Sequence, residues 1–386
     1  MKILYFCNYF QPMNYGENEI SQALIKLGHS VTIVTGDKYF PFPNYEDTVG
    51  KLLGSREQKV GKRKEKGVTV IREKIIIEFA ARAFFGGVKE RISQVKPDLI
   101  LVSGTSTPVA VQAALFKPNN TRLILIDSHL PSELRSGNTL FKDIFYFTFR
   151  TFFASLISKR ADKIIAVQEG TVQVIKQAYG IEKIPVIISH GTDMELFKFN
   201  KNERKNMRKK LGLKELDFVI ITTGKIIPAK GVELLFQACQ TLFKKHSTIH
   251  LLVIGDGPDE YKQKCLRFIP ESKKKHVHLE GIQRQNTLPA YYSAADVAVW
   301  PLQESLAMND AISCGLPIIA NDKIGVKERF SNKNAFLYEQ GNVTDLVKKI
   351  EYVFLHPTEG KKMGERGRKL VEQKMSWSQK AKEYIQ

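Results

Sequence analysis

The sequence predicts an α/β protein with two parallel-sheet domains. Its 386 residues exceed the roughly 250–300 that one hydrophobic core usually serves. Apolar, strand-like runs alternate with amphipathic helical patterns along the chain, which is typical of βαβ units. A polar, basic stretch at 198–214 separates two such series. We therefore expect domains at 1–197 and 215–371, joined by this stretch as a linker.

In the first domain, short apolar runs bounded by turn residues are expected to form buried strands. These runs lie at residues 2–7, 30–35, 98–103, 122–127, 163–167 and 185–188. Helical patterns fall between them, including a long one at about 140–160. Residues 48–67 are charged and punctuated by glycine, so a flexible excursion is expected there.

The second domain opens with a strand, a basic loop and a helix. A β-rich run at 218–223 stops at Gly224, and a helical pattern restarts at Gly231, with Lys225 and Lys230 between them. A helix N-terminus carries free N–H groups and partial positive charge, so two added lysines favour a bound diphosphate. The alternative is an ordinary strand-to-helix turn with solvated lysines.

Further patterns in the same order and spacing resemble a known family. GKIIPAKGVELL (224–235), LLVIGDGP (251–258) and ADVAVWPLQESLAMNDAISCGLPIIA (295–320) resemble the nucleotide-sugar half of a family 4 glycosyltransferase with the GT-B fold. MKILYFCNYFQPMNYGENEISQALIKLGHSVTIVT (1–35) resembles that family's first strand, glycine loop and first helix, and SHGTDMELF (189–197) resembles its linker. The resemblance implies two Rossmann-like domains facing a central cleft, with residues 372–386 packing back on the first.

Composition and charge indicate the compartment of the protein and the kinds of partner that it binds. The four cysteines lie far apart inside apolar patterns, which is typical of reduced, buried residues in a cytoplasmic protein. No secretory or membrane-spanning segment is evident. The net charge of +19 favours an anionic partner such as nucleic acid, anionic lipid or a phosphorylated substrate. No zinc-finger spacing or RNA-binding aromatic motif supports nucleic acid, which is therefore not expected.

The resemblance assigns both lysines of the basic loop to the donor diphosphate. Gly255, in the GDGP turn, would let the chain pass near the nucleotide. Gly281 and Ile282 would contact the base through backbone groups. Gly16, after the first strand, would allow a phosphate to approach closely, with a simple turn as the alternative.

The main departure from the family lies in PLQESLAMNDAISCG (301–315). The family has two glutamates separated by seven residues, whereas Glu304 and Asp310 are separated by five. Because Asp310 stands five residues before Gly315, as the second glutamate does, the ribose hydroxyls are assigned to it, and the sugar and phosphates to Glu304. The alternative for Asp310 is a carboxylate favoured by the helix dipole. Backbone N–H groups facing the phosphates would run from Ser305 through Leu306 and Ala307 to Asn309.

His129 follows directly on the expected strand at 122–127 and lies just before Pro131. A lone histidine is usually structural, but the matching family position is a histidine of the active site. Near neutral pH, histidine can accept or donate a proton. By resemblance, His129 would contact the transferred sugar or the acceptor hydroxyl.

The resemblance implies a retaining, metal-independent transferase without a cofactor. It would move a hexose from a UDP-, GDP- or ADP-sugar to a lipid-linked or polysaccharide acceptor at the cytoplasmic face of a membrane. Two alternative functions within the same fold are an inverting transferase and a nucleotide-sugar epimerase. A nucleotide-sugar-binding protein without turnover is a further alternative, motivated by the shortened glutamate spacing, and a nucleic-acid binder is motivated only by the charge.

The expected helix at 141–160 carries an aromatic stripe. Charged residues within it exclude a membrane span. Such a stripe is either core or, together with the positive charge, an interfacial surface that faces anionic lipid. The residues on the stripe are Phe141, Phe145, Phe149, Phe152 and Leu156.

Overall fold

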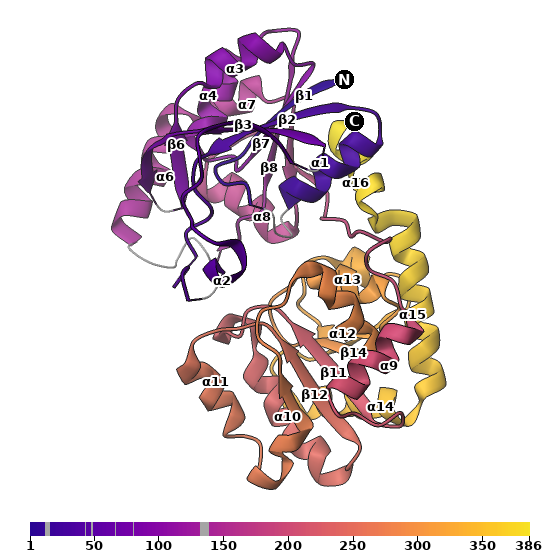
Figure 1. Cartoon of the computed structure of the whole chain (residues 1–386). Helices are drawn as coiled ribbons and strands as arrows, with labels where there is room; N and C mark the ends of the chain where they lie inside the picture. Colours follow the sequence, from indigo (N-terminus) through magenta and orange to yellow (C-terminus); the bar gives the residue numbers. More distant parts are fainter. Residues whose placement is uncertain (12–15, 43, 48, 66, 80, 132–138) are drawn as a thin grey trace. The chain divides into compact units, whose positions relative to one another are not determined.

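The computed structural model describes residues 1–11, 16–42, 44–47, 49–65, 67–79, 81–131 and 139–386. The chain divides into two compact units (Figure 1). Unit 1 consists of Met1–His190 and Trp377–Gln386, and unit 2 of Gly191–Ser376. Each unit is an α/β structure built on a mainly or wholly parallel sheet, as the sequence predicts.

Unit 1 contains the strands that the apolar runs predict, together with four strands within residues 61–85 that they do not. The strands are β1 (Lys2–Phe6), β2 (Ser30–Gly36), β3 (Gly61–Glu65), β4 (Val68–Glu73), β5 (Ile75–Phe79), β6 (Arg82–Phe85), β7 (Leu99–Ser103), β8 (Arg122–Asp127), β9 (Lys163–Ala166) and β10 (Val186–Ile187). The main sheet has the order β10-β9-β8-β7-β1-β2-β4-β3, and β5 pairs with β6. The runs were recognisable because strands of a parallel sheet are buried on both faces.

The expected excursion at 48–67 ends in the edge strand β3, which pairs antiparallel with β4. Its sequence, GKRKE, lacks the apolar alternation from which a strand is predicted. Lysines on an edge strand hinder pairing with other chains. The charge that indicated a loop is therefore compatible with a strand at this one position in the sheet.

The helices of unit 1 include one contributed by the C-terminal residues. They are α1 (Gly16–Lys26), α2 (Gly50–Leu53), α3 (Val88–Val95), α4 (Pro108–Phe116), α6 (Thr139–Phe152), α7 (Ala154–Arg160), α8 (Glu169–Gln173), the π-turn Val174–Ala178 and α16 (Trp377–Ile385). Trp377 and Tyr384 of α16 are buried in one apolar cluster with Ile20 and Leu24 of α1. The C-terminal helix therefore packs on the first unit, as the resemblance implies.

The aromatic stripe is mostly core. Phe149 is buried, and Phe145 and Leu156 pack against the same cluster, while Phe152 is exposed. The side chain of Phe141 lies outside the described residues. A different face of α6 is exposed.

Unit 2 is a parallel sheet in the order β13-β12-β11-β14-β15-β16. Its strands are β11 (Phe218–Thr223), β12 (Ile249–Ile254), β13 (Val277–Leu279), β14 (Val297–Trp300), β15 (Ile318–Asn321) and β16 (Ala335–Tyr338). Its helices are α9 (Lys201–Lys210), α10 (Val232–Lys245), α11 (Asp259–Leu266), α12 (Leu288–Ala294), α13 (Ala307–Ser313), α14 (Val343–Leu355) and α15 (Pro357–Leu370). Short 3-10 turns lie at Pro228–Lys230, Glu271–His276, Gln285–Thr287 and Lys327–Phe330, and a π-turn at Val371–Met375. The strand order reverses between β11 and β14, which is where open α/β sheets bind ligands.

The stretch expected as a linker, 198–214, belongs to unit 2. It contains α9, whose Arg208 is buried and donates to the backbone oxygens of Ala294 at 2.8 Å and Lys214 at 2.7 Å. Unit 1 ends at His190, before the expected boundary at 197. The sequence suggested a linker because α9 is rich in basic residues. Composition alone does not show that one of its arginines is buried.

All four cysteines are buried and unpaired, as predicted. No helix among the described residues is long and apolar enough to cross a membrane.

Candidate functional site

The predicted strand, basic loop and helix are present in unit 2. β11 ends at Thr223, and the chain turns through Gly224 with φ of +131°. A 3-10 turn carries Lys230, and α10 begins after Gly231, whose φ is +65°. A Cβ at Gly231 would lie 2.5 Å from Cγ of Leu302, so glycine is required here by both conformation and space.

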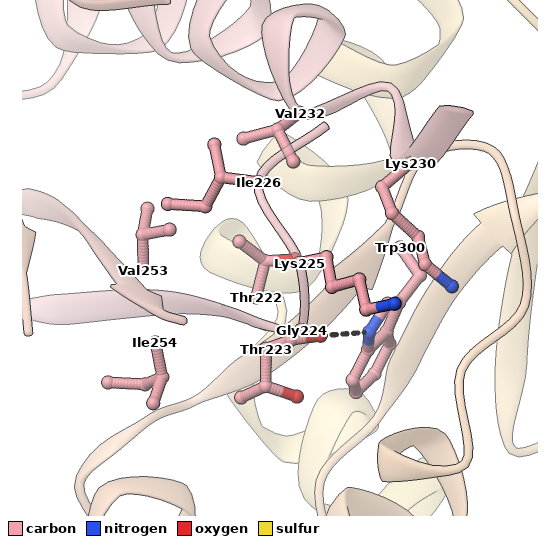
Figure 2. A pocket seen from close by; sticks show the side chains of 10 residues that line it. All are labelled: Thr222, Thr223, Gly224, Lys225, Ile226, Lys230, Val232, Val253, Ile254 and Trp300. Atoms are coloured by element: carbon pink, nitrogen blue, oxygen red, sulfur yellow. Dashed lines mark hydrogen bonds between the residues drawn. The ribbon is translucent and has the colours of Figure 1, made fainter. Parts of the chain in front are cut away.

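Lys225 and Lys230 line one small pocket, together with Trp300 (Figure 2). The pocket lies at the carboxyl ends of β11, β12 and β14. Trp300 Nε1 donates to the Thr223 carbonyl oxygen at 2.9 Å, which ties β14 to β11 at the reversal of strand order. Lys225 is exposed, whereas Lys230 is half-buried and donates to the Glu304 carbonyl oxygen. Two cations thus lie beside the N-terminus of α10, an arrangement that can bind an anionic group such as a diphosphate.

The loops that follow β11, β12 and β13 pack backbone against backbone. Gly255 has φ of +137°, and a Cβ there would lie only 1.9 Å from the carbonyl oxygen of Gly224. The Gly255 N–H donates to the carbonyl oxygen of Gly281 at 2.8 Å. Gly281 has φ of +63°, but no atom lies within 4 Å of a Cβ added there. Gly255 is therefore required by the packing of the loops, whereas Gly281 borders open space. Ile282 is half-buried.

The carboxylate of Glu304 is bound within unit 2. One oxygen accepts from the N–H groups of Gly325 at 2.6 Å and Val326 at 3.0 Å. The other accepts from Arg329 Nη1 at 3.1 Å. Arg329 is only 3% exposed, and burial lowers the pKa of its guanidinium although the charge of Glu304 opposes this. The role of Glu304 at the donor sugar stays a prediction.

Asp310 lies in α13 and is only 7% exposed. Its Oδ1 accepts from Thr192 Oγ1 at 2.6 Å. Ser305 lies beside Gly224, since its Oγ is 3.8 Å from a Cβ added there. Leu306 is exposed, and α13 begins at Ala307. The ribose role of Asp310 stays a prediction.

In unit 1, His129 follows directly on β8 and forms a pair with Asp127. His129 Nδ1 lies 2.8 Å from Asp127 Oδ1, and the same oxygen accepts from the His129 N–H at 3.0 Å. Asp127 Oδ2 accepts from the Thr105 N–H at 2.7 Å. The Asp127 side chain is buried, and that of His129 is 36% exposed. The sequence argument named His129 and missed Asp127, although an acidic residue two positions before it at a strand end was a usable signal.

Gly16 is the first residue of α1. A Cβ at this position would lie 2.7 Å from Cε1 of His190, so glycine allows this histidine to approach. The neighbouring Asn14 and Tyr15 lie outside the described residues. A role for Gly16 with phosphate stays a prediction.

The predicted residues fall into two groups. The larger group gathers along the carboxyl edge of the unit 2 sheet, whereas Gly16 and His129 belong to unit 1. Sequence reasoning missed Thr192 and Arg329, because their polar partners are far away along the chain. Over the described ranges, no group of three histidine, cysteine or acidic side chains could hold a metal ion.

Two family models match the chain, one in each half. The model described as Glycosyl transferases group 1 matches residues 203–370, and the model described as Glycosyltransferase Family 4 matches residues 18–196. Neither match extends across residues 197–202, which contain the first part of the stretch expected as a linker.

Individual relatives are distant. A lipopolysaccharide 1,2-N-acetylglucosaminetransferase of Salmonella typhimurium is 27% identical over 225 residues, or 54% of this chain and 58% of that protein. The chain thus spans about three fifths of that relative. A GDP-mannose-dependent alpha-(1-6)-phosphatidylinositol monomannoside mannosyltransferase of Mycolicibacterium smegmatis is 22% identical, over 86% of this chain and 90% of that protein. The crystal structure of Anabaena HepE in complex with UDP is similar in fold, with a TM-score of 0.72, 17% identity and coverage of 100% and 98%.

Proposed function

Because the chain belongs to glycosyltransferase family 4 and has the GT-B fold, we propose that it transfers a hexose from a nucleotide diphosphate sugar. The transfer retains the anomeric configuration and needs no metal or cofactor. The acceptor is a lipid-linked molecule or a polysaccharide at the cytoplasmic face of a membrane. The predicted family and fold are confirmed, and the reaction is our proposal.

The observation that supports this function best is the basic pocket at the reversal of strand order. Lys225 and Lys230 line it beside the N-terminus of α10. As the sugar leaves, negative charge grows on the nucleoside diphosphate. Two cations beside the diphosphate stabilise that charge, which lowers the barrier. A UDP-, GDP- or ADP-sugar would serve equally well by this criterion, because the lysines bind the diphosphate and not the base.

Binding of UDP, GDP and ADP tests the pocket. The nucleotide that raises the melting temperature identifies the donor base. Lys230→Ala should then weaken binding by about 1.5–3 kcal/mol, roughly ten- to hundredfold in Kd, since a hydrogen bond to a charged group is lost. Lys244→Ala, at the other end of α10 and exposed, is the matched control. Equal calorimetric affinities of both variants would remove Lys230 from the site.

A binding protein without turnover is the second candidate. It is favoured by the carboxylate of Glu304, whose two oxygens are bound by Arg329 and backbone N–H groups. Hydrolysis of the donor by the purified protein in the absence of acceptor would count against this candidate. Tight nucleotide binding with no hydrolysis and no transfer to any lipid or saccharide acceptor would favour it.

The membrane surface that we propose is the exposed face of α6. Leu140, Ile144 and Phe147 stand at intervals of four and three, so they share this face, and Phe147 is 65% exposed. The β5–β6 hairpin adjoins α6 because Arg82 donates to the Tyr146 hydroxyl at 3.1 Å. The hairpin has exposed apolar side chains of its own, those of Ile76, Ile77, Phe79 and Phe84. Apolar surface of this kind in a protein with a net charge of +19 suits an anionic bilayer surface.

Sedimentation with vesicles tests this surface. Vesicles that contain anionic lipid should bind the protein and release it as salt rises. Ile144→Ser combined with Phe147→Ser should reduce binding more than tenfold, because each buried apolar side chain contributes about 1.5–3 kcal/mol. Leu355→Ser, an exposed leucine of unit 2, is the control. Equal binding to neutral and anionic vesicles would contradict an electrostatic contribution to membrane binding. Binding to neither kind of vesicle would favour a soluble acceptor.

A further inference from the structure

Asp127, at the end of β8, is held by three hydrogen-bonding contacts. Its side chain is buried, and its two oxygens accept from two backbone N–H groups and one ring nitrogen. Burial by itself raises the pKa of Asp127, but the charge of His129 and the hydrogen bonds from His129 and Thr105 outweigh it and lower the pKa to about 2. The carboxyl group is therefore ionised at neutral pH and can only accept hydrogen bonds.

This ionisation decides where the imidazole carries its proton. His129 Nδ1 lies 2.8 Å from an oxygen that has no hydrogen to donate, so Nδ1 must be protonated. In a neutral imidazole the other nitrogen, Nε2, is then an acceptor. Asp127 also binds the backbone N–H of His129 through the same oxygen, so one carboxylate orients both the main chain and the ring.

The ring is confined from a second side. The rings of His129 and Tyr179 meet edge to face with centroids 6.5 Å apart, and Tyr179 is buried and stacks on Tyr146 at 5.5 Å. Tyr146 in turn accepts from Arg82. The imidazole thus has an ionised partner on one edge and a packed aromatic pair beside it.

We propose that Asp127 is a positioning residue that holds His129 as the Nδ1-protonated tautomer, so that Nε2 accepts a hydrogen bond from a hydroxyl group of the sugar or the acceptor. This inference rests on the proposed function for the substrate and on the Asp127–His129 contact for the tautomer. It explains why an acidic residue is useful two positions before the histidine. A carboxylate at this position specifies the direction of hydrogen bonding, which packing alone would not do.

The tautomer can be read directly by NMR of the full chain labelled with 15N-histidine. The two-bond 1H–15N pattern of His129 is identified by its absence in His129→Ala. In the neutral ring of the wild type we expect Nδ1 protonated and Nε2 unprotonated. Asp127→Asn should shift the population toward the Nε2-protonated form, because a neutral amide is a weaker acceptor for the Nδ1 proton than a carboxylate. Asp98→Asn is the control, since Asp98 also accepts a backbone N–H, that of Lys2 at 2.7 Å, but is exposed and lies at the other end of the sheet.

Turnover with the nucleotide sugar found by the binding screen gives the second readout. Asp127→Asn should lower kcat at least tenfold with little change in KM for the donor, whereas Asp98→Asn should change neither. A neutral His129 that carries its proton on Nε2 in the wild type, or a tautomer population unchanged in Asp127→Asn, would overturn the inference. The wild-type spectrum decides this even if the variant does not fold. The expected tautomers with turnover unaffected by Asp127→Asn and His129→Ala would overturn the role of the pair in the reaction and leave the donor site untouched.

Discussion

Glu304→Ala should destabilise unit 2, whether or not Glu304 also takes part in turnover. Glu304 is the ion-pair partner of Arg329, whose guanidinium is 3% exposed. Removing one partner of a buried pair costs about 3–5 kcal/mol, because the other charge stays buried without compensation. For a domain of this size each kcal/mol corresponds to roughly 2–4 °C, so the melting temperature should fall by about 6–20 °C.

Differential scanning calorimetry of a small set of variants tests the reasoning. Glu304→Ala combined with Arg329→Met should recover part of the loss, because no charge is then left buried. Glu359→Ala, which breaks the more exposed pair with Arg366, is the control and should change the melting temperature little. If Glu304→Ala melted like the wild type but lost turnover, the structural account of Glu304 would be wrong and the catalytic prediction would stand.

Three more predictions concern other positions. Burial lowers the pKa of His250 to about 4, so between about pH 6.5 and pH 4 the unfolded chain binds a proton at this residue and the folded chain does not. The unfolding free energy should therefore decrease as the pH falls through this range, by at most about 1.4 kcal/mol per pH unit for this group. His250→Gln should flatten the slope in urea titrations, and an unchanged slope would contradict this. Gly255→Ala should lower the unfolding free energy by about 2–6 kcal/mol in the same assay, because the added Cβ would clash with the Gly224 carbonyl oxygen. Gly281→Ala should lower it by only about 1–2 kcal/mol, and equal losses would contradict the loop packing. His129→Ala should lower turnover by roughly two orders of magnitude while nucleotide affinity holds, and normal turnover would exclude a role at the sugar.

Local patterns were sufficient for much of the fold and for part of the site. The strand at 218–223, the basic loop and the helix after it follow from a change of apolar period, which depends on neighbouring residues only. The loops that carry Lys225, Gly255 and Gly281 then meet because carboxyl ends of parallel strands share one edge of a sheet. The strand β3 was missed, since its position at an edge allows charged residues that no local pattern associates with a strand.

The partners of the site side chains depend on tertiary structure. Glu304 meets Arg329 across 25 positions of the chain, and Thr192 donates to Asp310 across 118. On α6, Phe149 lies in the core and Phe147 is exposed, although both are aromatic residues of one amphipathic helix. The sequence by itself determined where charged and apolar groups occur along each element. Tertiary structure alone decided which of them are satisfied inside the protein and which face a ligand, because hydrogen bonding and desolvation depend on contacts between residues distant in the chain.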